Sequence, residues 1–230
     1  MKKLFLSLIL IMFFATSSFA GTIVIDVGHT SEKPGVISAR GNPEIYFNII
    51  VAAVLAKKLS KDHKIFILAD LPLQDRVKEI NKANPDLVIS IHHGSVQEKY
   101  LSKWKFEGKE YYYSDKFSGF SIFVSKSNDD FKNSLRFATL VGRFLTESGL
   151  YPNNHTEAIP GENRELLNKD YGIYRYDDLV ILKTKYPSIL LECGIIVNRS
   201  DEISLRSDYI INTFTDSITK AVNVYFNHSL

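Results

Sequence analysis

The sequence predicts an α/β fold, a single-domain three-layer sandwich with a mixed, mostly parallel sheet of about six strands and helices on both faces. Three observations favour this class. Short apolar, β-branched runs alternate with longer segments of helical periodicity. No repeat, low-complexity tract or linker divides the chain. About 210 residues remain after the first twenty, which is an ordinary size for one domain.

Six segments have the composition of buried strands, because each is short, rich in Ile, Val and Leu, and bounded by polar or turn-forming residues. These are residues 22–26, 64–68, 87–91, 119–125, 178–183 and 188–192.

Helical periodicity marks four further segments, at residues 43–60, 73–84, 131–148 and 200–226, the last as one long helix or a helix pair. Pro43 suits a first helical turn, and Gly149 follows the third segment as a helix terminator. Residues 94–118 and 151–178 are polar, aromatic excursions, and loops of that length are usually functional or mobile.

The first twenty residues have the pattern of an export signal. Lys2 and Lys3 precede an apolar run over residues 4–15, and Ser18 and Ala20 offer small side chains for a signal peptidase. The alternative is an uncleaved membrane anchor, but the run is shorter than the roughly 20 residues that a bilayer span needs. We therefore expect a signal peptide at 1–20, a catalytic domain at 21–230, and export to a periplasm or the cell exterior.

Charge and cysteine content narrow the class of partner. Loss of Lys2 and Lys3 leaves 26 basic residues against 26 acidic ones, so the exported chain is close to neutral. Nothing in that balance indicates nucleic acid or a charged membrane surface as a partner, and no second apolar stretch is long enough to span a membrane. Cys193 is the only cysteine, so no internal disulfide is expected. We expect a monomer.

Polar side chains follow three of the predicted strands where each strand ends. His29 follows the first, His92 ends the third, and Glu192 ends the last. Ligand sites of open α/β sheets lie outside the carboxyl ends of their strands. The three side chains are therefore expected to meet in one crevice although they are far apart in sequence.

Two histidines near carboxylates indicate a metal, because catalytic zinc takes three protein ligands, often two His and one Glu. Glu44, at the start of the second predicted element, is the best third ligand for His29 and His92. A second carboxylate is then needed to move a proton from water to the leaving group, and Glu192 suits that role by position. The expected cofactor is Zn²⁺.

Each candidate also has a plain structural interpretation. Glu44 near a helix start favours the helix dipole with or without a metal, and His29 fits a loop hydrogen bond. Strand alternation lets only one of His92 and His93 point at a given site. Glu192 is harder to explain structurally, because a carboxylate next to a buried run needs a partner.

Two common hydrolase signatures are missing from the sequence. There is no His-Glu-x-x-His helix motif and no Gly-x-Ser-x-Gly elbow, which disfavours the usual zinc peptidases and serine hydrolases. Cys193 is a poor nucleophile candidate, because alternation turns it away from the side chain of Glu192.

Four segments resemble, in the same order, segments of the zinc-dependent N-acetylmuramoyl-L-alanine amidases, the family typified by bacterial cell-separation amidases. Residues 23–29 (IVIDVGH) resemble that family's Ile-Asp-Pro-Gly-His, and Glu44 with Asn48 resembles its Glu with a nearby Asn. Residues 86–92 (DLVISIH) resemble its Asp-Leu-Phe-Ile-Ser-Ile-His, and residues 187–194 (PSILLECG) with Asn198 resemble its Pro-Ala-Val-Leu-Val-Glu-Leu-Gly. The likeness spans about residues 22–226.

The resemblance implies zinc on His29, Glu44 and His92, with Glu192 as the catalytic carboxylate. It implies a peptidoglycan substrate, cut at the amide between N-acetylmuramic acid and the L-alanine of the stem peptide. It also implies a mixed six-stranded sheet flanked by helices, and leaves room for a protein activator.

The sequence departs from the family pattern at several positions. Val27 replaces the usual Pro, Thr30 and Ser31 replace a Gly pair, and His93-Gly94 replaces Ala-Asn. The two excursions are expected to form groove walls, with His93, His155, Arg164 and Arg175 as candidate substrate contacts, together with Tyr174 and Tyr176. His155 is alternatively a further ligand to the metal or the transition state. Some relatives carry an inhibitory acidic helix, a role open here to Glu157, Glu162 and Glu165.

Two other functions stay open at this point. One is a zinc carboxypeptidase or other amidohydrolase acting on cell-wall peptides. The other is an inactive protein that binds or regulates peptidoglycan, which predicts a broken set of site residues. All four candidates are present, which favours an active enzyme.

Overall fold

The computed structural model describes residues 21–153 and 164–227, so the expected signal peptide lies outside the described residues. His155, Glu157 and Glu162, each considered above for a role at the site, also lie outside them. Within the described residues, none of the helices combines the length and the apolar character that crossing a membrane requires.

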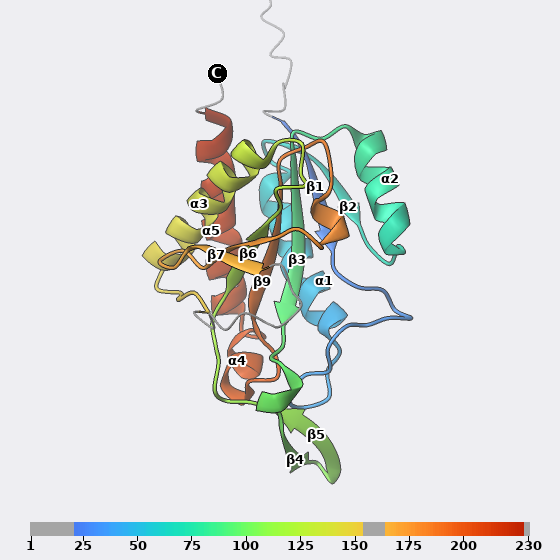
Figure 1. Ribbon diagram of the computed structural model, residues 1–230, viewed down its shortest axis with the longest axis vertical. Helices are drawn as coiled ribbons and strands as arrows, with labels where there is room; N and C mark the ends of the chain where they lie inside the picture. Colours follow the sequence, from blue (N-terminus) through green and yellow to red (C-terminus); the bar gives the residue numbers. More distant parts are fainter. Residues whose placement is uncertain (1–20, 154–163, 228–230) are drawn as a thin grey trace, which may run out of the picture.

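A seven-stranded sheet forms the centre of the molecule, in the order β2-β1-β3-β9-β6-β8-β7 (Figure 1). Parallel pairs join β2, β1, β3 and β9, and also β6 and β8, whereas β6–β9 and β7–β8 are antiparallel. The strands are β1 (Thr22–Val27), β2 (Lys64–Leu68), β3 (Leu87–Gly94), β6 (Ser121–Val124), β7 (Arg164–Asn168), β8 (Ile173–Tyr176) and β9 (Ser188–Ile195).

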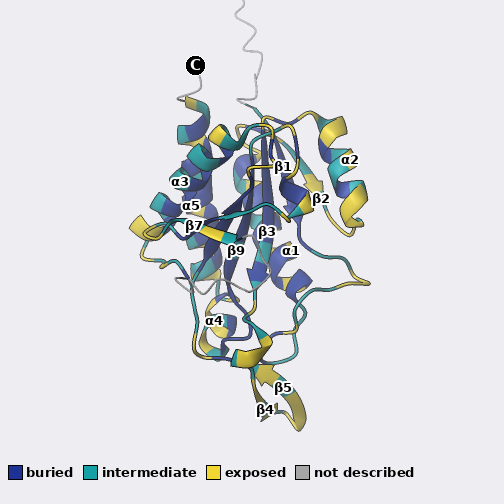
Figure 2. Cartoon of the chain, in the orientation of Figure 1, coloured by how far each residue is buried: buried dark blue, intermediate teal, exposed yellow. Residues whose placement is uncertain are grey.

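Three long helices cover one face of the sheet: α1 (Glu44–Leu59), α3 (Phe131–Glu147) and α5 (Asp208–Asn227). This face is called the packing face here. In the central strands β1, β3 and β9, every second residue, such as Ile23, Ile89 and Leu191, is buried against these helices. The strands β1, β3 and β9 lie in the dark, buried centre of Figure 2.

Among the residues that the structure describes, the opposite face, called the thin face here, is covered by α2 (Leu73–Ala83) and a 3₁₀ turn, η2 (Val180–Leu182). Val24, Val88 and Leu190 point to this side and are buried with Ile80 of α2 and Leu182 of η2. The three layers of the predicted sandwich are therefore present, but they are unequal in depth.

Two regions differ from the sequence-based expectation. The strand predicted at 178–183 is wrong, because Ile181 and Leu182 are buried side by side in the turn η2, without the alternation of a strand. The excursion 151–178 instead contains the strands β7 and β8, whose mixed polar and aromatic composition suits the edge of a sheet. One predicted strand is replaced by two, so the sheet has seven strands.

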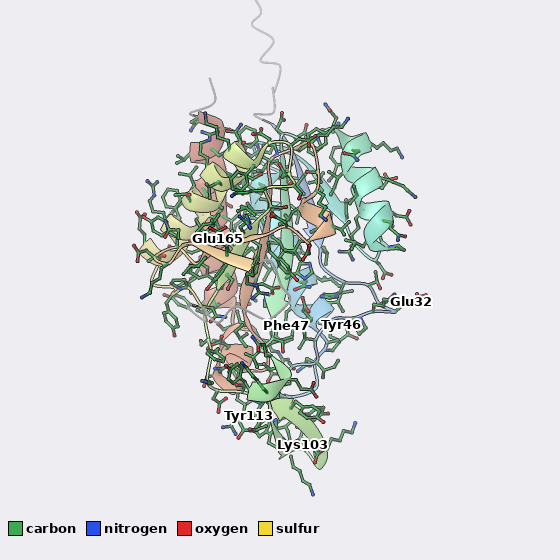
Figure 3. All side chains as sticks on the ribbon, in the orientation of Figure 1. Glu32, Tyr46, Phe47, Lys103, Tyr113 and Glu165 are labelled. Atoms are coloured by element: carbon green, nitrogen blue, oxygen red, sulfur yellow. The ribbon has the colours of Figure 1, made fainter. Side chains whose placement is uncertain are left out.

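The other excursion leaves the sheet altogether. It contains a 3₁₀ turn, η1 (Glu98–Tyr100), and a hairpin of β4 (Ser102–Phe106) and β5 (Lys109–Tyr113). Figure 3 places Lys103 and Tyr113 on this hairpin, at the end of the molecule away from the termini. The C-terminal segment is a helix pair, because α4 (Arg199–Ser204), capped by the Asn198 side chain, precedes α5.

Cys193 lies on the packing face, with 2% of its surface exposed. Burial raises the pKa of its thiol well above the ordinary value. The strand alternation that was expected to turn it away from Glu192 is confirmed.

Candidate metal centre

The structure brings together the three side chains predicted to bind a metal. His29 follows β1, Glu44 is the first residue of α1, and His92 lies near the end of β3. Glu44 Oε2 lies 2.9 Å from His29 Nε2, and Glu44 Oε1 lies 3.0 Å from His92 Nδ1. The two imidazole rings meet edge to face, with their centroids 5.0 Å apart.

Glu44 is the buried member of this group, with 2% of its surface exposed. Its carboxylate also accepts hydrogen bonds from the amides of His93 and Val36, at 3.1 and 3.2 Å. Burial alone would raise the pKa of Glu44, but the bonds from His29 and His92 outweigh it, so the pKa lies well below its ordinary value. Glu44 is therefore a carboxylate that is ready to accept a cation.

Two glycines leave the room that these side chains occupy. A Cβ added to Gly28 would come within 2.4 Å of the His92 ring, and one on Gly35 within 2.4 Å of Glu44 Oε2. Gly35 also has φ +81°, a backbone conformation that side-chain-bearing residues rarely adopt. The loop after β1 thus wraps closely around the site.

The donor set fits zinc. One atom from each of His29, Glu44 and His92 lies within 4.8 Å of the others, which is compatible with a single ion between them. Two imidazole nitrogens and one carboxylate oxygen are a ligand set that catalytic zinc takes, with a further position left for water or substrate.

His93 lies on the other side of its strand. Its side chain is buried, its Nδ1 lies 2.7 Å from Asn48 Oδ1, and its ring lies against Phe47 of α1. Burial lowers the pKa of His93 to about 3, so the ring is neutral. The structure thus separates the two adjacent histidines by strand alternation, and His92 is the one beside Glu44 and His29.

Glu192 stands beside His92, because β9 pairs with β3 so that these two residues are in register. Its Oε2 atom is buried and has no hydrogen-bond partner among the described residues. Burial raises the pKa of Glu192 to about 7, although the charge of His92 partly opposes this shift. A carboxylate with that pKa can both take up and release a proton near neutral pH.

A groove of about 660 Å³ opens from His29 and His92 across the thin face. Its walls are the loop after β1, the segment that leads into α2, and η2. Figure 3 places Glu32 at the tip of the first wall. The candidate metal centre is therefore open to a substrate from this side.

Residues 23–224 match the family model described as N-acetylmuramoyl-L-alanine amidase. The chain belongs to this family. It is accordingly a hydrolase that acts on peptidoglycan, at the amide between N-acetylmuramic acid and L-alanine.

The amidase is similar to other proteins, in sequence or in fold, over about nine tenths of its length. It is 28% identical to a putative N-acetylmuramoyl-L-alanine amidase of Buchnera aphidicola, over 90% of this chain and 95% of that one. It is 26% identical to an uncharacterized Bacillus subtilis protein, YqiI, over 90% of this chain and 85% of that one. Among solved structures it resembles an N-acetylmuramoyl-L-alanine amidase of Clostridium difficile 630, with a TM-score of 0.70 and 21% identity over 91% of this chain and 98% of the other.

The arginines considered as substrate contacts occupy different environments in the amidase. The Arg164 guanidinium lies over the rings of Phe123 and Tyr176, at 5.1 and 5.3 Å. Arg175 is paired with Glu165 at 2.6 Å and with Asp177 at 3.2 Å. Glu165, considered as an inhibitory residue, is thus engaged by a neighbouring strand.

A buried polar network beside the metal centre did not emerge from the sequence. Asp26, fully buried on β1, accepts hydrogen bonds from Arg76 Nη1 at 3.2 Å and from Ser90 Oγ at 2.6 Å. Arg76 also donates to the carbonyl of His29. The available signal was an aspartate inside an apolar strand, which calls for a buried partner.

Proposed function

We propose that this amidase is a zinc enzyme in which His29, Glu44 and His92 hold the ion and Glu192 carries the proton. The observation that supports this most strongly is the placement of Glu192, which stands in register with His92 with a buried, unpartnered oxygen. Zinc supplies Lewis-acid chemistry, which polarises a carbonyl and makes water more acidic.

The chain's own residues account for the proton transfers. Glu192 Oε2 takes a proton from the attacking water as its oxygen bonds to the scissile carbonyl carbon. The same oxygen then gives the proton to the departing nitrogen of L-alanine when the amide bond breaks. A pKa of about 7 suits both steps, because near neutral pH the side chain passes readily between its carboxylate and its carboxylic acid form.

The site's surroundings fit a glycopeptide substrate. The groove extends from His29 and His92 to η2, and its walls mix apolar side chains from η2 with polar ones such as Ser31 and Lys33. Arg164 and the tyrosines of β8 lie on the other flank of Glu192, where Arg suits contact with a carboxylate of the stem peptide. His155 and Arg175 remain proposed substrate contacts, whereas the burial of His93 against Phe47 and Asn48 removes it from this role.

We also propose that residues 1–20 direct export and that the enzyme works in a periplasm or outside the cell, as a monomer, with or without a protein activator. Peptidoglycan lies outside the inner membrane, which agrees with the charged, apolar and small-residue pattern of the first twenty residues. The size of the exported chain in culture fractions would test the cleavage site.

The test of the reaction is product analysis. The purified enzyme, stripped with a chelator and reloaded with zinc, is incubated with peptidoglycan. We expect stem peptides with a free L-alanine amino group, and loss of activity in the stripped sample. Release of single amino acids with the lactyl amide intact would identify a carboxypeptidase instead, and absence of any product would contradict the proposal.

A further inference from the structure

We propose that Arg76 is a positioning residue for His29, in addition to being the counter-ion of Asp26. The inference rests on the proposed role of His29 as a zinc ligand. Arg76 lies on the first turns of α2, which belongs to a different part of the chain from the three ligands. Its guanidinium nevertheless contacts the main chain of one of them.

The backbone of His29 needs such support. Its φ is +70°, in the left-handed region that residues other than glycine rarely occupy without help from their surroundings. A histidine in this conformation directs its ring toward Glu44 only while the loop holds that turn. The carbonyl oxygen of His29 accepts a hydrogen bond from Arg76 Nη2, which fixes the peptide plane directly after the strained residue.

Arg76 is itself held on several sides. Its Nε donates to the carbonyl of Leu71 at 2.7 Å, and its Nη1 donates to Asp26 at 3.2 Å. Asp26 is fixed in turn by Ser90, on the neighbouring strand β3. The planar guanidinium offers its donors in fixed directions, and a lysine ammonium at the same place could not reproduce all three.

A second pair of bonds ties the same two segments together. The amide and hydroxyl of Ser31 donate to Asp70 Oδ1, at 2.7 and 2.9 Å. The loop after β1 is therefore tied to the region of α2 at two points, His29 through Arg76 and Ser31 through Asp70. Because both segments line the groove, the ligand and the groove wall share one support.

The plain alternative is that Arg76 only neutralises the buried charge of Asp26. The two roles differ in what happens when both charges are removed together. A purely neutralising role predicts that Asp26→Asn combined with Arg76→Leu restores the site, because no lone charge is left buried. A positioning role predicts that the double variant still lacks support for the His29 carbonyl.

The experiment measures zinc affinity by competition with a chromogenic chelator, and ligand geometry by the visible absorption of the Co²⁺-loaded enzyme. We expect Arg76→Lys and the double variant to weaken zinc binding about 10- to 100-fold, as is typical for residues that orient a ligand. Both should also show altered Co²⁺ spectra. The matched control is Arg136→Lys, since Arg136 also donates to a main-chain carbonyl, that of Tyr225, but lies on the packing face. Its zinc affinity should equal that of the wild type.

Unchanged zinc affinity and an unchanged Co²⁺ spectrum in the double variant would overturn the inference while leaving the proposed function intact. That double variant also decides the matter if Arg76→Lys alone does not fold. Failure of the wild type to bind zinc, or full affinity in His29→Ala, would overturn the proposed function itself. The two failures are therefore distinguishable.

Discussion

The two faces of the sheet differ in depth and in what they carry. Among the described residues, the packing face buries a cluster of thirty apolar side chains under α1, α3 and α5, whereas the thin face buries eight under α2 and η2. The groove opens beside the shallower layer, and the candidate metal centre lies at the carboxyl edge where the two faces meet. Glu44 reaches this edge from α1, and Glu192 from β9. Most of the stability should therefore come from residues of the packing face, whereas substrate access should depend on residues of the thin face.

The largest effect is expected at that edge. Glu192→Gln keeps the shape of the side chain but removes the proton carrier, so turnover should fall by at least about a thousandfold. Zinc content, measured by elemental analysis, should stay at the wild-type level. A variant that retained turnover would show that another group moves the proton.

A deletion on the packing face should affect stability and not chemistry. Phe137 of α3 is fully buried and lies against Tyr225 of α5, with ring centroids 5.3 Å apart. Phe137→Ala should lower the free energy of unfolding by about 3–5 kcal/mol, as large-to-small changes in cores do. Denaturant titration gives that value, and activity per folded molecule should equal that of the wild type. A large loss of specific activity would mean that the two faces are coupled.

A deletion on the thin face should affect both properties, each to a smaller extent. Ile181 is buried in the thin layer and also lines the groove. Ile181→Ala should cost about 2 kcal/mol of unfolding free energy, near the low end for such changes, because the open groove lets neighbours relax. It should also raise KM for peptidoglycan fragments with kcat nearly unchanged. An unchanged KM would remove η2 from the substrate path.

The smallest effect is a pH dependence on the packing face. His63 is buried against Phe226, and burial lowers its pKa below the ordinary 6.5. As the pH falls, the unfolded chain takes up this proton before the folded one does. Its contribution to stability is thus present above pH 6.5 and declines below it. As the pH is lowered from 7.5 to 5, the melting temperature of the wild type should fall more steeply than that of His63→Gln. Parallel curves of melting temperature against pH would contradict the assignment.

The strands and long helices could be predicted because their own residues determine them. β1, β3 and β9 are apolar on both sides, and the ends of α1, α2 and α3 agree with the predicted segments to within about a residue. His29, His92 and Glu192 could be expected to lie together because parallel strands place their carboxyl ends at one edge of the sheet, and Glu44 because it starts the helix that follows the first of these strands. The meeting of His29, Glu44 and His92 confirms their expected proximity.

The remaining features depend on partners that are distant in sequence. β7 and β8 are strands because β6 offers an open edge to β8, and their own composition resembles a loop. The turn η2 looked like a strand because an apolar run of this length does not reveal its period. Arg76 reads as an ordinary polar residue of α2, and only the folded chain shows that it reaches Asp26 and His29.

The buried position of Cys193 has a practical consequence. The chain has a single thiol, so its folding requires no oxidant and cannot be trapped by a wrong internal disulfide. In the folded enzyme that thiol is shielded and protonated, and it meets a reagent only when the core around β9 opens. The rate at which the Cys193 thiol is alkylated therefore reports how often the strand that carries Glu192 opens, and the measurement needs no added cysteine or label.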